Sequence, residues 1–254
     1  MPSPDEPSAP AAPSAAPAAF PQRIALFGGS FDPPHNGHLA IAHAALTAFQ
    51  LDSVLFAPVA RQPLKIDSAP PTEFAHRAAM TALAIAHEPR FALSLLDAPR
   101  DDRQPNFTVD ALLRLRAQHP PLTRFFFLLG ADALQQLPRW HRAAEIPFLA
   151  TLLVASRPDS ELGADPLASA PQWLPPTLLL HRNAKTSASI LHLQVEDAHH
   201  RTADIFFLHG LNFDISASHL RSCLSAPHIP HLELATLLPA SVLDYIRSHD
   251  LYLG

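Results

Sequence analysis

Short apolar runs and amphipathic segments alternate along the first two thirds of the chain. Apolar runs with the length of buried strands occur at 23–27, 53–58, 91–96, 124–130 and 148–156. Segments with apolar residues at helical spacing occur at 38–49, 72–87, 107–118 and 131–137, and Thr72 is a candidate N-cap. Strands that alternate with helices form parallel sheets with helices on both faces. The pattern therefore predicts an α/β protein with a doubly wound, Rossmann-like parallel sheet.

The last third of the chain departs from this alternation. A proline-rich stretch begins at Arg157, and we expect residues 157–203 to form an irregular insertion. Short strand candidates occur in and after it, at 177–181, 190–195 and 204–210. A serine cap opens a predicted helix at 215–224, and Pro239 begins another at 239–252. A C-terminal helical segment is therefore expected.

The N-terminus has a different composition from the rest of the chain. Residues 1–21 consist almost entirely of proline, alanine and serine, with neither the basic start nor the apolar core of a signal peptide. We expect this segment to be a disordered tail that precedes one domain at 22–254.

Composition and charge narrow the class of protein. The net charge of −5 does not favour nucleic acid as a partner, and the chain lacks an apolar run near 18 residues that could span a membrane. The single cysteine, Cys223, excludes an internal disulfide. With 48% hydrophobic residues the chain can bury a substantial core. We expect a cytoplasmic protein that binds neither nucleic acid nor a membrane.

Glycines cluster after the first predicted strand, in GGSFDPPHNGH at 28–38. Only seven glycines occur in 254 residues, yet Gly28, Gly29 and Gly37 lie within ten positions of one another. Glycines permit a tight turn and close approach of a ligand, and the N-terminus of the following helix attracts anions. In doubly wound sheets, ligands bind at this end of the strands. The loop is therefore a candidate phosphate site.

Two histidines lie at the mouth of the same helix. His35 and His38 are three residues apart, so both rings can point to one side of the first helical turn. Two such donors directed at a phosphate would stabilise the charge that develops during nucleotidyl transfer. A metal pair, for which no clear third ligand is present, and unrelated surface histidines among the sixteen in the chain are the alternatives.

Four ordered segments carry a family resemblance. GGSFDPPHNGH resembles the GG[ST]FDPxHxGH motif of bacterial nicotinate mononucleotide adenylyltransferases, which belong to the nucleotidyltransferase superfamily with an HxGH loop. FLLGADALQQLPRW, ISASHLRSCL and LPASVLDYIRSHDLY resemble further segments of that family, in the same order. The resemblance implies that ATP and nicotinate mononucleotide react to give deamido-NAD and pyrophosphate, with Mg²⁺ carried by the ATP.

The resemblance also implies which residues hold ATP. His35, His38 and Arg221 would be catalytic, since they contact the phosphates and stabilise the transition state. The planar fork of an arginine suits a pyrophosphate leaving group, although Arg221 could instead be a solvated helix residue. No metal-ligating residue is implied. The residues that would bind ATP are Gly28, Gly29, Ser30, Phe31, Gly37, Ile215, Ser216 and Ser218.

A second set of residues would bind the mononucleotide. By resemblance, Asp132 would bind ribose hydroxyls, Trp140 would stack on the pyridine ring, and Thr108 would receive the nicotinate carboxylate next to Phe107. Lys65 would contact phosphate. Four of these residues have structural alternatives. Asp132 could be a helix N-terminal acid and Trp140 a core residue. Thr108 could be a helix cap and Lys65 a solvated lysine.

Departures from the family pattern affect the same set. Phe107 stands where the family usually has tyrosine, and Leu64 stands where it often has histidine before Lys65. An adenylyltransferase for another phosphomonoester, such as nicotinamide mononucleotide or phosphopantetheine, is one alternative function. A non-catalytic nucleotide-binding regulator is another. No motif indicates the oligomeric state or the role of the tail.

Overall fold

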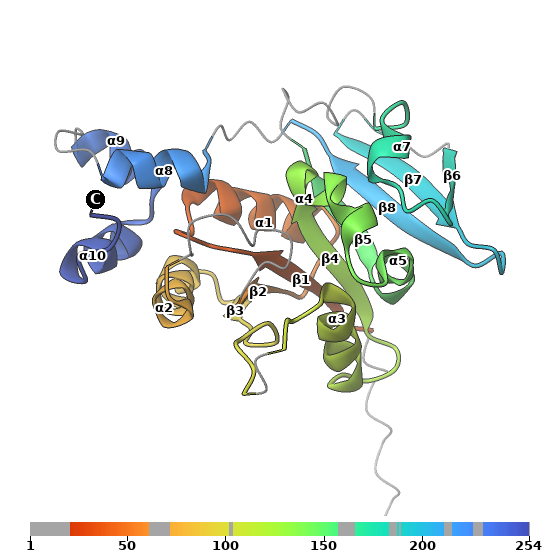
Figure 1. The fold of residues 1–254 in the computed structure, drawn as a ribbon, viewed down its shortest axis with the longest axis horizontal. Helices are drawn as coiled ribbons and strands as arrows, with labels where there is room; N and C mark the ends of the chain where they lie inside the picture. Colours follow the sequence, from red (N-terminus) through yellow and green to blue (C-terminus); the bar gives the residue numbers. More distant parts are fainter. Residues whose placement is uncertain are drawn as a thin grey trace, which may run out of the picture.

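The fold is described by a computed structural model that covers residues 21–60, 72–101, 104–156, 166–182, 187, 189–210, 215–225 and 231–253 (Figure 1). Its strands form one eight-stranded sheet with the order β3-β2-β1-β4-β5-β8-β7-β6. The predicted tail and Lys65 lie outside the described residues. Helices cover both faces of the sheet, so the predicted α/β, doubly wound class is confirmed.

The first six strands in this order run parallel. They are β3 (Phe91–Leu93), β2 (Ser53–Pro58), β1 (Arg23–Gly29), β4 (Arg124–Gly130), β5 (Thr151–Ala155) and β8 (Thr202–Leu208). From β1 the chain builds outward to β3 and then returns to build β4 and β5 on the other side. The strand order therefore reverses between β1 and β4, and in such sheets ligands bind at that point, beyond the carboxyl ends of the strands.

The edge beyond β8 is antiparallel. β7 (Ile190–Glu196) pairs antiparallel with β8, and β6 (Leu179–Arg182) pairs antiparallel with β7. The purely parallel pattern does not continue here because the turn from Glu196 to Thr202 is too short for a crossover helix. With the short helix α7 (Ala170–Trp173), these strands give regular structure to part of 157–203, where we expected an irregular insertion.

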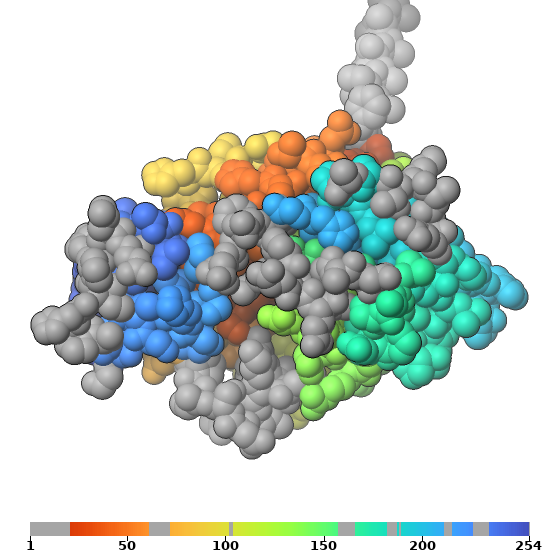
Figure 2. Space-filling model, turned by 90° about the horizontal axis from the view of Figure 1, so that it is seen from above, coloured from red at the N-terminus to blue at the C-terminus, as the bar shows by residue number. Residues whose placement is uncertain are grey.

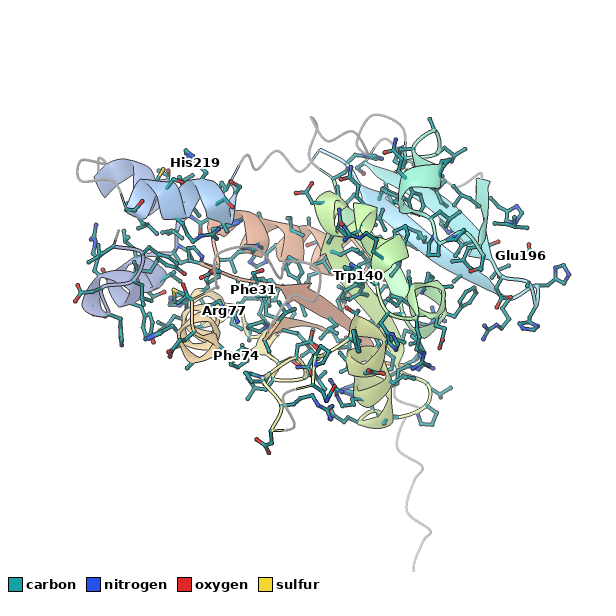
Figure 3. All side chains as sticks on the ribbon, in the orientation of Figure 1. Phe31, Phe74, Arg77, Trp140, Glu196 and His219 are labelled. Carbon is teal, nitrogen blue, oxygen red and sulfur yellow. The ribbon has the colours of Figure 1, made fainter. Side chains whose placement is uncertain are left out.

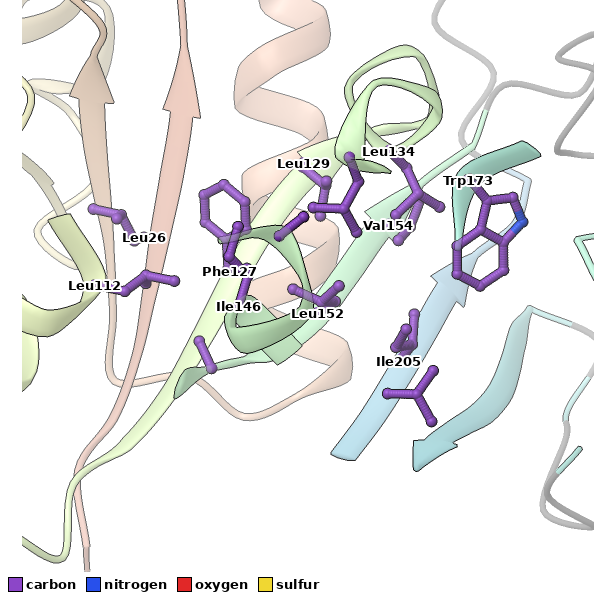
Figure 4. Close-up of a cluster of buried hydrophobic side chains, with 14 of the residues drawn as sticks. Leu26, Leu112, Phe127, Leu129, Leu134, Ile146, Leu152, Val154, Trp173 and Ile205 are labelled. Carbon is purple, nitrogen blue, oxygen red and sulfur yellow. The ribbon is translucent and has the colours of Figure 1, made fainter. Parts of the chain in front are cut away.

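One face of the sheet is covered by α3 (Thr108–Ala117), α4 (Ala131–Gln135), α5 (Ile146–Leu149) and α7, with the 3₁₀ turns η1 (Leu137–Arg139) and η2 (Ala143–Glu145). Side chains of alternate strand residues meet these helices, as Phe127 meets Ile146 in the core shown in Figure 4. Trp173 of α7 is fully buried in the same core. The core thus continues from the parallel strands to the antiparallel edge.

The opposite face is covered by α1 (Asn36–Ala48), α2 (Phe74–Ile85), α8 (Ala217–Leu224), α9 (His231–Leu237) and α10 (Ala240–Ser248). Leu128, the neighbour of Phe127, points to this side, as the period of two along a strand requires. In the view of Figure 2, the C-terminal helices (blue) and the antiparallel strands (cyan) lie at opposite ends of the molecule.

Several boundaries differ from those predicted. β3 ends at Leu93 rather than at residue 96, because the chain turns where the amide of Ala98 bonds to the carbonyl of Leu95. The predicted strand at 148–156 begins only at Thr151, since α5 occupies the residues before it. The N-cap of α2 is Glu73 rather than Thr72. The short helix α9 was not predicted.

Candidate active site

The glycine loop lies at the reversal of the strand order. β1 ends at Gly29, which is paired in register with Pro58 at the end of β2, and the neighbouring β4 ends at Gly130. A Cβ atom on Gly29 would lie 3.1 Å from the ring of Phe31, which is closer than side chains normally pack. Any side chain at position 29 would therefore require the Phe31 ring to shift, so the tight packing favours glycine there.

The loop leads directly into α1, where the two histidines meet. His35 is the N-cap of α1 and His38 lies in its first turn. Their rings are stacked, with centroids 3.7 Å apart and planes at 29°. The amide of His35 donates to Nδ1 of His38 at 3.2 Å, so a neutral His38 carries its proton on Nε2. The spacing predicted that both rings share one side of the helix, and the stack confirms it.

Two aromatic rings pack against His38, one of the two histidines. The ring of Phe31 lies 5.0 Å from that of His38, and that of Phe27 lies 6.0 Å from it. Phe31 is 1% exposed and has a positive φ of 47°, a conformation that costs a non-glycine residue about 1–2 kcal/mol. Its side chain therefore packs in the core, and only its backbone can face a ligand.

Arg221 reaches the same loop from α8. Its Nη1 donates to the backbone oxygen of Asp32 at 2.8 Å and lies 4.0 Å from the Asp32 carboxylate. Its Nη2 donates to the hydroxyl of Ser218 at 3.2 Å. The side chain is still 39% exposed, so the guanidinium can reach a bound anion. The fold thus brings the predicted arginine into contact with Asp32, which lies three positions before His35 in the sequence.

Asp32 itself is a residue that sequence reasoning missed. It is 5% exposed, its Oδ1 accepts from the hydroxyl of Tyr252 at 2.7 Å, and its Oδ2 accepts from the amide of Thr72 at 3.3 Å. Burial and the contact with Asp32 raise the pKa of Tyr252 above its ordinary value, so the hydroxyl remains a donor. Both residues lie in segments that carry the family resemblance, yet a single sequence gives no signal that they pair.

Arg77 is a second missed residue. It is 1% exposed, and its guanidinium donates to the carbonyl oxygens of Ser30, Val59, Ala60 and Thr72 at 2.8–3.2 Å. Burial lowers the pKa of Arg77, while Asp32 and Tyr252 oppose that shift. A buried arginine at this point ties together the loops that follow β1 and β2. Its position on an amphipathic helix was the only available signal.

The start of α8 is built as predicted. Ser216 is the N-cap, and its hydroxyl accepts from the amide of His219 at 3.1 Å. Ile215 is buried in the core, so its side chain is not available to a ligand, whereas Ser218 is exposed. α8 and the loop that leads into α1 are joined through Arg221 and Asp32.

The predicted mononucleotide residues lie on the β4 side. Asp132 is exposed in the first turn of α4, directly after β4. Trp140 is half-buried, with its ring 6.1 Å from that of Phe127, so it combines a core contact with an accessible part. In Figure 3, Trp140 lies next to β4, whereas Phe31 and Arg77, a residue of α2, lie near each other away from it.

The start of α3 is connected to this side by an aromatic contact. The ring of Phe107 lies 4.4 Å from that of His141, the residue after Trp140. Phe107 is the N-cap of α3 and Thr108 is its first residue, so Thr108 does not act as the cap. The structure thus places Phe107, at the start of α3, beside the residue that follows Trp140.

The part of the chain that the structure describes contains neither a cluster of metal-ligating side chains nor a helix that could span a membrane. There, no group of three or more histidine, cysteine, aspartate or glutamate residues is arranged to hold a metal ion. The same residues include no helix long and apolar enough to cross a bilayer. The histidine pair and Arg221 supply imidazole and guanidinium nitrogens, which are donors suited to phosphate oxygens.

Comparison with known proteins adds a family to this geometry. A family model described as cytidylyltransferase-like matches residues 26–222. The chain is 34% identical over 232 residues to a probable nicotinate-nucleotide adenylyltransferase of Synechococcus sp. (strain JA-2-3B'a(2-13)), covering 91% of this chain and 98% of that protein. It is 34% identical over 235 residues to the probable enzyme of the same name from Herpetosiphon aurantiacus, covering 92% and 100%.

Solved structures agree on the fold. A nicotinic acid mononucleotide adenylyltransferase of Plasmodium falciparum, complexed with NaAD, superposes with a TM-score of 0.64 at 18% identity, covering 91% of this chain and 97% of that one. At that identity the likeness concerns the fold alone.

Proposed function

Because the chain belongs to the nicotinate-nucleotide adenylyltransferases of the cytidylyltransferase-like family, we propose that its site transfers the adenylyl group of ATP to nicotinate mononucleotide. An oxygen of the mononucleotide 5′-phosphate attacks the α-phosphorus of ATP, and the bond from that phosphorus to the oxygen bridging to the β-phosphate breaks. The products are nicotinate adenine dinucleotide and pyrophosphate. No covalent enzyme intermediate is required.

The observation that carries this proposal is the stacked histidine pair at the start of α1, next to which Arg221 binds the backbone oxygen of Asp32 in the preceding loop. His38 Nε2 and His35 donate to the phosphates of ATP and stabilise the negative charge that builds in the transition state. Arg221 binds the departing pyrophosphate with its remaining N–H groups. The protein contributes position and charge rather than a nucleophile.

The backbone of the loop completes the ATP site. Gly28, Gly29, Ser30 and Gly37 allow the phosphates to approach the main chain and the positive end of α1. Ser216 and Ser218, at the start of α8, bind the outer phosphates. Phe31 and Ile215 contribute by packing beneath these segments, since both side chains are buried.

The mononucleotide lies on the β4 side. Trp140 stacks on the pyridine ring, because a flat, partly accessible indole offers the face that a heteroaromatic ring needs. Asp132 binds the ribose hydroxyls, and Thr108 with the amides that begin α3 receives the nicotinate carboxylate next to Phe107. Lys65, which lies outside the described residues, contacts phosphate.

ATP would bring Mg²⁺ to this site as its counter-ion. The histidines and Arg221 offer nitrogen donors, and the nearby Asp32 carboxylate is buried and bonded to Tyr252 and Thr72, whereas Mg²⁺ takes oxygen ligands. Phosphate oxygens and water would therefore hold the ion, and it would neutralise charge on the β- and γ-phosphates. Because ATP and the mononucleotide are intracellular metabolites, we assign the reaction to the cytoplasm.

The direct test is a panel of acceptors. Pyrophosphate release is measured with ATP, Mg²⁺ and, in turn, nicotinate mononucleotide, nicotinamide mononucleotide and phosphopantetheine. We expect the highest kcat/KM with nicotinate mononucleotide. A higher value with either other acceptor assigns the enzyme to that substrate, and no release with any acceptor leaves only a non-catalytic nucleotide-binding protein.

A further inference from the structure

The catalytic loop and Arg221 are held together by a contact that no proposed substrate touches. The Asp32 carboxylate is buried, and the Tyr252 hydroxyl, at 2.7 Å, is its shortest hydrogen bond. The backbone oxygen of the same aspartate accepts from Arg221 at 2.8 Å. Asp32 therefore bonds both to Arg221, which is proposed to bind pyrophosphate, and to Tyr252 near the C-terminal end of the described chain.

These contacts join segments that are remote in the sequence. Asp32 and Arg221 are separated by 189 positions, and Asp32 and Tyr252 by 220. Asp32 lies only three residues before His35, so any shift of its peptide moves the mouth of α1. The contact of Tyr252 with Asp32 therefore bears on both the histidine pair and Arg221.

The conformation of Tyr252 indicates that its contacts constrain it. Its φ is 64°, in the left-handed region, which costs a non-glycine residue about 1–2 kcal/mol. The bond to Asp32 and the partial burial of the side chain offset that cost. Such constrained residues are concentrated where a precise geometry is maintained.

Resting on the proposed adenylyl transfer, we propose that Tyr252 and Asp32 are positioning residues that orient Arg221 toward the pyrophosphate. The Tyr252 hydroxyl fixes the carboxylate of Asp32, and Asp32 fixes one nitrogen of the guanidinium through its backbone oxygen. The other N–H groups of Arg221 are thereby presented to the leaving group. Neither Tyr252 nor Asp32 touches the reacting atoms.

The chain contains a matched control for this proposal. It has only two tyrosines, and Tyr245 also lies near the C-terminus, with its hydroxyl 3.0 Å from Nδ1 of His76. That contact joins α10 to α2 and does not involve the loop at Asp32. Tyr252→Phe and Tyr245→Phe each remove one hydroxyl and keep the ring.

The test combines turnover with pyrophosphate binding in the full-length protein. We expect Tyr252→Phe to lower kcat about tenfold and to weaken pyrophosphate binding, measured by calorimetry, by a similar factor, since a bond to a charged group is lost. The KM for the mononucleotide should not change. Tyr245→Phe should stay within twofold of wild type in each measurement.

A double-mutant cycle separates positioning from a structural effect. If Tyr252 acts through Arg221, Tyr252→Phe should cost less than twofold in an Arg221→Ala background. The same tenfold loss in both backgrounds, or equal behaviour of the two tyrosine variants, would overturn the proposal. If the wild-type enzyme released no pyrophosphate with any acceptor, the proposed function would fail, and the calorimetric comparison would still decide whether Tyr252 orients Arg221.

Discussion

The rings of His35 and His38 stack with centroids 3.7 Å apart, and the amide of His35 fixes Nδ1 of His38. His35 is buried, whereas His38 is only partly so. Nε2 of His38 carries the proton in the neutral ring. Because His38 is less buried than His35, its ring is the more accessible donor of the two. From this geometry we propose that His38 makes the larger share of direct phosphate contact.

Replacing His38 by alanine should lower kcat by about two to three orders of magnitude, the effect of losing one donor to a transition-state oxyanion. Steady-state pyrophosphate release measures this change. His43→Ala is the control, because His43 lies on the same helix with a side chain that is 50% exposed. Turnover of the His38 variant within twofold of wild type would show that this ring does not contact the reacting phosphates.

Replacing Trp140 by alanine should raise the KM for nicotinate mononucleotide roughly ten- to hundredfold, since stacking on an aromatic face contributes about 1–3 kcal/mol per base. The KM for ATP should remain close to wild type. Trp140→Phe keeps an aromatic face and should lose much less. Initial rates at varied concentrations of each substrate provide the measurement, and an effect confined to ATP would contradict the stacking role.

Replacing Arg77 by methionine should destabilise the fold by about 3–5 kcal/mol, because four carbonyl oxygens around a buried site lose their donor. Arg77→Lys should recover only part of this loss, since an ammonium group cannot span the same fork of acceptors. Urea unfolding gives both values. A loss below about 1 kcal/mol in the methionine variant would mean that water replaces these bonds at little cost.

The sequence predicted those parts of the molecule that depend on local patterning. β1, β2 and β4 follow from apolar runs, and the meeting of His35 with His38 follows from their spacing of three on one helix. Ser216 as the cap of α8 is also a local property. In each case the interacting residues lie within one helical turn or one strand.

Contacts between distant segments could not be predicted in this way. Asp32 belongs to the loop motif and Tyr252 to the C-terminal segment that carry the family resemblance. A single sequence does not show which polar residues form a pair across 220 positions. Arg77 resembled any arginine on an amphipathic helix until the fold buried it. Strands were predicted close to β6, β7 and β8, but not their antiparallel pairing, because strand direction depends on the turn after β7 rather than on the strand's own residues.

Asp97, which lies in the turn after β3, should make stability depend on pH in an unusual direction. It is 6% exposed, and among the described residues its Oδ1 accepts no hydrogen bond. Burial raises the pKa of Asp97 from 3.8 to about 6, while Arg114 opposes the shift. Between these two pKa values the folded state binds the proton more tightly than the unfolded state, so this group lowers stability as pH rises through that window.

The Asp97→Asn variant removes this dependence. A shift of about two units corresponds to about 3 kcal/mol, so the variant should be more stable than wild type by about that amount above pH 7, and by less than about 1 kcal/mol at pH 4. Urea unfolding across pH 4–8 measures the difference. Asp244→Asn removes the same charge from an exposed position on α10 and should change stability by less than about 0.5 kcal/mol. If the gain of the Asp97 variant did not grow between pH 4 and pH 7, the carboxylate would have to be compensated in the folded state, and burial would not govern its titration.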